Sequence, residues 1–287
     1  MTATVLVALD GSDKDERAFP VAVRLAHLAD GVVHLIHVLA APVEHHSIDG
    51  GAPDGSGAPR TLRDAAAHHL REAAERLTPL VRRTVTWEVA DGHDIAATLL
   101  ARAEELNADL VVMATRAPGP VGRVIYGSVA DQIVRESRRP VVVVPPGAHF
   151  LGGKQVQLRR ALVPLDGSSA ALGVLTHLLA LARADELEVV LLEVVAPSPG
   201  HTDAAHAEQR LASVAERVRS RGVTVDVRIV EAADPAAVII DAVRQELADF
   251  IAMTTRGASG LQRLVLGSVA TAVVRKSEVC VFVVTPG

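Results

Sequence analysis

The same sequence pattern occurs twice in this chain. The run Val5-Leu-Val-Ala-Leu-Asp-Gly-Ser12 returns as Ala161-Leu-Val-Pro-Leu-Asp-Gly-Ser168, and Gly127-Ser-Val-Ala130 returns as Gly267-Ser-Val-Ala270. Self-similarity over more than a hundred residues is typical of a duplicated folding unit. The chain is therefore expected to fold as two copies of one domain rather than around a single core.

The length agrees with two domains. A chain of 287 residues exceeds the roughly 100 to 200 residues that one hydrophobic core usually serves. We predict domains at residues 1–147 and 159–287, joined by a linker at residues 148–158 that contains Gly152-Gly153. The first copy alone carries an insert at residues 42–60, rich in Gly, Pro, Asp and His, which we expect to be a mobile surface loop.

Each copy alternates short apolar runs with helical patterns. Hydrophobic residues make up 49% of the chain and aromatic residues only 2%, so Val, Leu, Ile and Ala must fill the cores, as in strands buried on both faces. We predict the α/β class, with two tandem doubly wound five-stranded parallel-sheet domains in the order 3-2-1-4-5. In the first copy the expected strands are residues 5–9, 32–39, 85–89, 110–114 and 141–144, with helices at 62–77 and 94–105.

Composition excludes several classes of partner. The net charge is -5 without a basic stripe, and few aromatic residues are available to stack on bases, so no nucleic acid is expected. No apolar stretch approaches the roughly 18 residues of a membrane span, and no signal peptide is recognised, which predicts a cytoplasmic protein without membrane contact. Cys280 lies in an apolar run and is expected to be a core residue.

Motifs of common enzymes are missing from the sequence. Gly152-Gly153-Lys154 does not complete a Walker A motif, and no GxSxG, HExxH or CxxC occurs. No metal site is predicted, because the adjacent pairs His45-His46 and His68-His69 diverge on a helix and are expected to be surface histidines. The sequence therefore gives no positive indication of an enzyme.

The repeated motifs fall where an open parallel sheet binds ligands, beyond the carboxyl ends of its first and fourth strands. Asp10-Gly11-Ser12 and Asp166-Gly167-Ser168 each end a strand and open a helix. The carboxylate can accept bonds from ribose hydroxyls or an adenine amino group. The alternative is that Asp and Ser only cap the turn.

The second pair of motifs is suited to phosphate. Gly127-Ser128 and Gly267-Ser268 each open a helix after a loop, where free backbone N–H groups and the helix dipole converge on an anion. The alternative is a glycine loop with a helix cap and no ligand. Because both motifs recur in both copies, a binding site is favoured.

These residues resemble the universal stress protein family, whose nucleotide-binding members have the motif G-x2-G-x9-G-[ST] after the fourth strand. The resemblance covers nearly the whole chain and indicates a tandem, adenine-nucleotide alpha-hydrolase-like member. The second copy has Thr254, Gly257 and Gly267-Ser268 at the motif positions, whereas the first has Ala114, Ala117 and Gly127-Ser128, with Pro118 in its loop.

The resemblance implies an adenine-nucleotide site in each copy. Asp10 and Asp166, with Val38 and Val194, would contact adenine, and the glycine loops would hold ribose and phosphates. The implied residues are Asp10, Gly11, Val38, Ala114, Arg116, Ala117, Gly127, Ser128 and Val129 in the first copy, and Asp166, Gly167, Val194, Thr254, Arg256, Gly257, Gly267, Ser268 and Val269 in the second. The expected cofactor is ATP, with or without Mg²⁺. The resemblance further implies that the final strands, 141–144 and 281–284, pair with each other and that the chain forms a homodimer.

The leading hypothesis is an ATP-binding universal stress protein that acts in the stress response as a nucleotide-dependent regulator of a protein partner. The main alternative is a scaffold of the same fold that binds no nucleotide. A third is a nucleotidyl-transferring enzyme, for which no nucleophile or base can be named.

Overall fold

The computed structural model describes residues 2–41, 59–115, 127–148, 156–181, 186–197, 202–255 and 266–286. The chain divides into two compact units, unit 1 (Met1–Met113) and unit 2 (Ala114–Gly287). Residues 42–58 of the predicted insert and residues 149–155 of the predicted linker lie outside the described residues.

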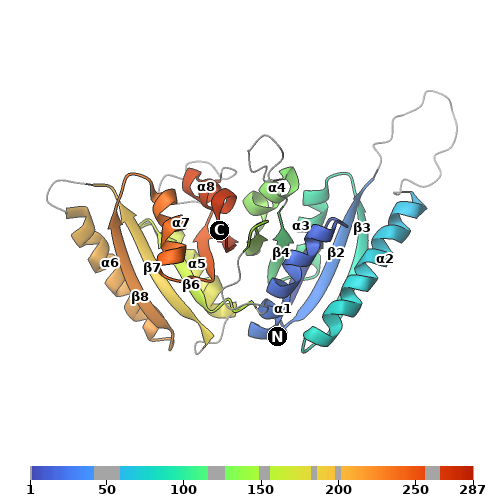
Figure 1. Cartoon of the computed structure of the whole chain (residues 1–287), viewed down its shortest axis with the longest axis horizontal. Coiled ribbons are helices and arrows are strands. Elements are labelled where there is room, and N and C mark those ends of the chain that lie inside the picture. Colours follow the sequence, from blue (N-terminus) through green and yellow to red (C-terminus); the bar gives the residue numbers. More distant parts are fainter. Residues whose placement is uncertain are drawn as a thin grey trace, which may run out of the picture. The chain divides into compact units, whose positions relative to one another are not determined.

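Unit 1 is a parallel sheet with helices in its crossovers, in the strand order β3-β2-β1-β4 (Figure 1). The register aligns Leu9 of β1 with His37 of β2. Its elements are β1 (Thr4–Leu9), the 3-10 turn η1 (Asp13–Arg17), α1 (Ala18–Leu28), β2 (Val32–Ala40), α2 (Arg60–Leu77), the 3-10 turn η2 (Thr78–Leu80), β3 (Val85–Gly92), α3 (Ile95–Glu105) and β4 (Leu110–Ala114).

Unit 2 contains the last helix and the last strand of the first copy and the whole second copy, in the strand order β5-β10-β9-β6-β7-β8. The register aligns Leu165 of β6 with Glu193 of β7. Its elements are α4 (Ser128–Glu136), β5 (Val141–Val144), β6 (Arg160–Leu165), α5 (Ser169–Leu181), β7 (Glu188–Val195), α6 (Thr202–Arg219), β8 (Thr224–Glu231), α7 (Pro235–Gln245), β9 (Phe250–Thr254), α8 (Ser268–Lys276) and β10 (Cys280–Val284).

The predicted topology is confirmed. Strands β6 to β10 of the second copy take the order 3-2-1-4-5, and the first four strands of the first copy take the order 3-2-1-4 within unit 1. The final strands also pair as expected, since β5 and β10 run antiparallel with Val142 opposite Phe282. The apolar runs predicted these strands well because β4, β5, β9 and β10 are buried along almost their whole length.

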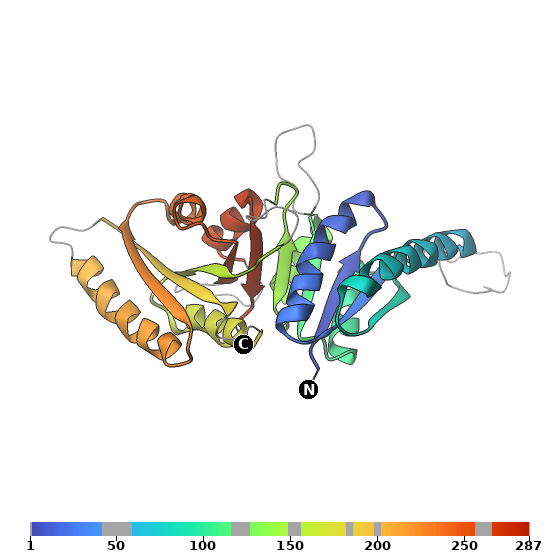
Figure 2. The same ribbon diagram turned by 60° about the horizontal axis from the view of Figure 1, so that its bottom comes forward.

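Helices cover the sheets in the pattern that right-handed crossovers impose. Strands β1, β2 and β3 follow one another in one direction, so α1 and α2 lie on the same face of unit 1, toward the viewer in Figure 2. The same rule places α5 and α6 on one face of unit 2, where α6 packs along β7 and β8. The chain returns across the sheet before β4 and β9, which puts the switch point of the winding at the carboxyl ends of β1 and β4, and of β6 and β9.

The core is mainly aliphatic and includes the cysteine. Cys280 is buried, as predicted, and burial raises the pKa of its thiol to about 12. None of the described helices is both long and apolar enough to cross a membrane.

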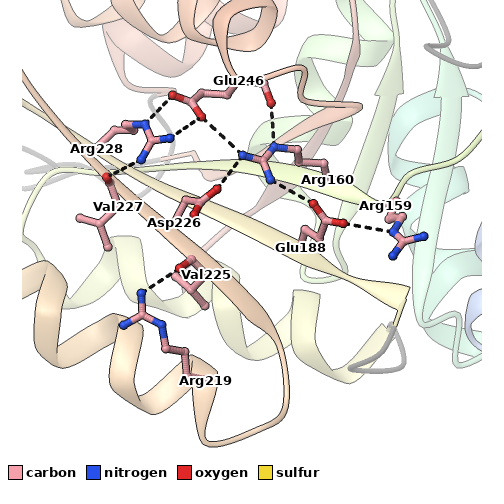
Figure 3. Close-up of polar contacts among 9 residues, drawn as sticks. All are labelled: Arg159, Arg160, Glu188, Arg219, Val225, Asp226, Val227, Arg228 and Glu246. Carbon is pink, nitrogen blue, oxygen red and sulfur yellow. Dashed lines mark hydrogen bonds and ion pairs between the residues drawn. The ribbon is translucent and has the colours of Figure 1, made fainter.

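A network of charged groups holds the amino-terminal ends of β6, β7 and β8 together (Figure 3). Arg160 donates to the backbone carbonyl of Glu246 at 2.7 Å, to Glu188 at 3.0 Å and to Asp226 at 2.7 Å. Its side chain is only 22% exposed, whereas Arg159, which pairs with Glu188 at 3.3 Å, is 58% exposed. Arg160 therefore links three strands and the end of α7 through bonds that little water can replace.

We expect Arg160→Ala to destabilise the chain by about 2 kcal/mol, because Asp226 and the Glu246 carbonyl lose this donor and Glu188 keeps only its longer pair with Arg159. The matched variant Arg159→Ala should cost less than about 0.5 kcal/mol, since it removes one exposed ion pair. Urea unfolding followed by circular dichroism measures both. Equal losses of stability in the two variants would contradict this role of Arg160.

Candidate functional site

A cavity of about 170 Å³ opens at the switch point of the second copy. The carboxyl ends of β6, β7 and β9 and the first turn of α8 form its walls, with α7 beside them. Six of the residues predicted from the sequence line it together: Asp166, Val194, Thr254, Gly267, Ser268 and Val269. Residues far apart in the sequence thus meet at one site.

The Asp166 turn is fixed by hydrogen bonds to its own side chains. Gly167 has φ +79°, a conformation that favours glycine. The Asp166 carboxylate accepts from the Ser168 backbone N–H at 3.0 Å and from its hydroxyl at 2.6 Å, and the Ser168 hydroxyl accepts from the N–H of Ala171 at 3.2 Å. The capping role considered from the sequence is present, and Asp166 lines the cavity as well.

The amino terminus of α8 presents backbone donors to the same cavity. Gly267 is the N-cap residue with φ -58° and makes no side-chain cap. Thr271 is the first residue of the helix whose N–H bonds back, to Gly267 at 2.8 Å. The N–H groups of Ser268, Val269 and Ala270 therefore have no acceptor within the helix, and all three residues line the cavity. This arrangement favours an anion.

Thr255 also lines the cavity, and its side chain was not singled out by the sequence analysis. The residue is 2% exposed, and its hydroxyl has no hydrogen-bond partner among the described residues. Its backbone is held in place, because its N–H donates to Val284 at 2.9 Å and its carbonyl accepts from Gly267 at 2.8 Å. A buried hydroxyl without a partner is costly, so a ligand that bonds to it would recover that cost.

The remaining predicted residues are distributed as follows. Gly167, which belongs to the same turn, lines a different cavity, described below. In the first copy, Asp10 and Gly11 form the equivalent turn, Val38 is buried in β2, Ala114 ends β4, and Gly127, Ser128 and Val129 begin α4. Arg116, Ala117, Arg256 and Gly257 lie outside the described residues.

The turn of the first copy contains a buried carboxylate that the sequence analysis missed. Asp15 is 4% exposed and accepts from the backbone N–H groups of Asp10 at 2.7 Å and Gly11 at 2.8 Å. Burial, reinforced by the negative charge of Asp10, raises the pKa of Asp15 to about 7. Ala171, which lines the cavity of the second copy, stands five residues after Asp166, as Asp15 stands five after Asp10.

Two histidines surround this turn. His69 lies 3.8 Å from the Asp15 carboxylate, and a Cβ atom on Gly11 would lie 2.9 Å from the ring of His37. Burial, together with the neighbouring His69, lowers the pKa of His37. The expectation of surface histidines holds for the exposed His68 but not for the largely buried His69. In the part of the chain that the structure describes, no group of three or more His, Cys, Asp or Glu could hold a metal ion.

The fold and the cavity define a duplicated, doubly wound α/β protein, and comparison with known proteins gives its family. The model of the universal stress protein family matches residues 1–145 and again residues 157–285. The chain therefore belongs to the universal stress protein family and is a tandem member with two such domains.

Individual relatives agree with the tandem arrangement. A universal stress protein of Mycolicibacterium smegmatis is 28% identical over 296 residues, covering 98% of this chain and 97% of its own. One of Thermus aquaticus is 33% identical over 149 residues, covering 50% of this chain and 99% of its own. The crystal structure of a universal stress protein from Archaeoglobus fulgidus covers 99% of this chain and 96% of its own, with a TM-score of 0.70 and 21% identity, and so shares the fold.

We expect the stability of Asp15→Asn to depend less on pH than that of the wild type. In the unfolded chain the Asp15 carboxyl ionises near its ordinary pKa of 3.8, but in the folded chain only near a pKa of about 7. Its contribution to stability is therefore complete at low pH and is lost as the pH rises from about 4 to about 7. Asn cannot ionise, so the variant should gain on the order of 1 to 2 kcal/mol over the wild type between pH 4 and pH 8.

Urea unfolding at a series of pH values measures this difference. Asp64→Asn, on the exposed face of α2, serves as a control with the same chemical change. If the free energy of unfolding of Asp15→Asn differs from that of the wild type by the same amount at every pH, the assignment of a buried, protonated carboxyl to Asp15 is wrong.

Proposed function

We propose that this chain binds ATP in the cavity of its second copy and acts as a nucleotide-dependent regulator in the stress response. The observation that supports the proposal is the cavity itself, which is lined both by a carboxylate at the end of β6 and by backbone N–H groups at the start of α8 that have no acceptor within the helix. A nucleotide needs both, acceptors for its base and ribose and donors for its phosphates.

Each part of the cavity then has a role. The Asp166 carboxylate accepts from ribose hydroxyls or the adenine amino group, and Val194 and Met253 supply apolar surface for the base. The N–H groups of Ser268 and Val269 bind phosphate oxygens, since the helix dipole adds to their attraction. Arg256 and Gly257 complete this set by their place in the family motif.

The second copy suits a nucleotide better than the first. In the first copy the Asp15 carboxylate occupies the position of Ala171, which is part of the cavity wall in the second copy. At a pH above its pKa of about 7, Asp15 places a further negative charge beside Asp10, which opposes the binding of phosphate. Ala114 and Ala117 also stand where the family motif has glycine.

The proposed activity is binding rather than catalysis. Nucleotide occupancy would set the conformation or the choice of a regulatory protein partner, with slow hydrolysis of ATP, with or without Mg²⁺, as a secondary property. We further propose a cytoplasmic protein that forms homodimers and consists of domains at residues 1–147 and 159–287.

A second candidate function is a scaffold of the same fold that binds no nucleotide. Ala114, Ala117 and Thr254, which stand at motif glycine positions, favour it because each adds a side chain where a glycine would let the backbone approach phosphate closely. Copurified nucleotide distinguishes the two functions.

Mass spectrometry of the ligand released from denatured protein should detect ATP, and calorimetric titration should show ATP binding to the nucleotide-free protein. Gly267→Trp should abolish most of this binding because the indole fills the cavity mouth in front of the α8 N–H groups. Gly127→Trp, the same change at the equivalent position of the first copy, should retain it. Asp166→Asn should weaken binding about ten-fold, as expected for one lost charge-assisted hydrogen bond.

Circular dichroism establishes that each variant is folded. Absence of both copurified nucleotide and heat of ATP binding would favour the scaffold. Loss of binding in Gly127→Trp but not in Gly267→Trp would place the nucleotide in the first copy and contradict the proposal.

A further inference from the structure

A second cavity lies behind the first, on the opposite face of the sheet. Neighbouring residues of a strand point to opposite faces, and Val194 lines the first cavity while Glu193 lines the second. The second cavity has a volume of about 320 Å³ and lies between α5 and α6. Leu165 and Leu172 give it an apolar wall, continued by Leu211 and Val214 of α6.

One guanidinium in this cavity has no partner among the described residues. Arg210 and Arg217 lie seven residues apart on α6, and therefore on one face of the helix. Arg210 pairs with Glu193, whose side chain is 4% exposed. The guanidinium of Arg217 makes no hydrogen bond or ion pair with any residue that the structure describes, although its backbone carbonyl accepts from the hydroxyl of Ser220 at 2.8 Å. The cavity thus combines apolar walls, one neutralised ion pair and one positive charge that remains available.

In the first copy the arginine at the corresponding position forms an ion pair within the chain. Buried residues align α2 with α6, Leu70 with Leu211 and Leu77 with Val218, so that Arg76 corresponds to Arg217. Arg76 forms an ion pair with Glu16, in the 3-10 turn that precedes α1.

In the second copy Leu172 stands where the first copy has Glu16, five residues after the turn glycine. The second copy thus has an apolar side chain where the first has a carboxylate, while both copies have the arginine. The cavity beside Leu172 is therefore matched to a carboxylate that arrives from outside with apolar material attached.

We propose that this second cavity binds a small organic acid, one carboxylate on an apolar body. The carboxylate pairs with the guanidinium of Arg217 and accepts from the hydroxyl of Ser213, and the hydrocarbon packs on Leu165, Leu172 and Val214. A nucleotide does not suit this cavity, because a single available guanidinium balances one negative charge and the Glu193 carboxylate, already paired, would repel more.

Octanoate is a suitable probe, and a two-dimensional NMR titration of the full chain is the measurement. We expect saturable shifts of amide signals from α5, α6 and the Gly167 turn. Hexan-1-ol, which has an apolar body but no charge, and acetate, which has the charge but no body, should each bind at least about ten-fold more weakly, since each loses one of the two interactions.

Two variants test the site without touching the core. Arg217→Gln should weaken octanoate binding about ten-fold, as expected for one lost charge-assisted bond. Ser213→Trp, at an exposed position of α6, should fill the cavity and abolish binding. Arg221→Gln, the same change in charge at an exposed position after α6, is the control and should bind as the wild type does.

Three results would overturn the proposal. One is the absence of saturable shifts up to about 10 mM octanoate, which would leave less than about 3 kcal/mol of binding free energy. Another is unchanged affinity in both Arg217→Gln and Ser213→Trp. The third is displacement of octanoate by ATP with shifts confined to α8, which would assign the octanoate to the first cavity.

Discussion

The antiparallel pairing of β5 with β10 is the constraint on which unit 2 depends. All four valines of β5 are buried, and so are the residues of β10, so either strand left alone would expose an apolar edge with unpaired backbone groups. Pairing Val142 with Phe282 removes both edges at once. The pairing also fixes the candidate site, because the N–H of Thr255 bonds to Val284 of β10 and the carbonyl of Thr255 holds Gly267 at the start of α8.

Duplication has kept the backbone of the two turns and changed the charges around them. Gly11 and Gly167 have the same φ of +79°. Behind Gly11 stand two histidines and the buried Asp15, whose protonation varies near neutral pH. Beside Gly167 lies the ion pair between Arg210 and Glu193. One fold thus carries two turns with different electrostatic surroundings.

The sequence predicted the parts of this structure that depend on local pattern. Apolar runs located the strands because strands buried on both faces consist almost entirely of apolar residues. The Asp-Gly-Ser turn was found because it occurs in both copies. Side chains that meet only through the packing of a helix on the sheet were missed. Arg210 pairs with Glu193 because α6 packs on β7, and no short sequence motif predicts that contact. Thr255 was missed because its burial depends on β10 as a neighbour, and only that burial leaves its hydroxyl without a partner among the described residues.

Leu165 belongs to the walls of both cavities, and the turn that follows it contributes Asp166 to one and Gly167 to the other. The end of β6 is therefore a single partition with a space on each side. A molecule that binds in one cavity and displaces the end of β6 therefore changes the volume and the hydrogen-bonding groups of the other cavity. Thermodynamic linkage makes such an effect reciprocal: if a ligand in one cavity raises the affinity of the other cavity for its ligand, the second ligand raises the affinity for the first by the same factor.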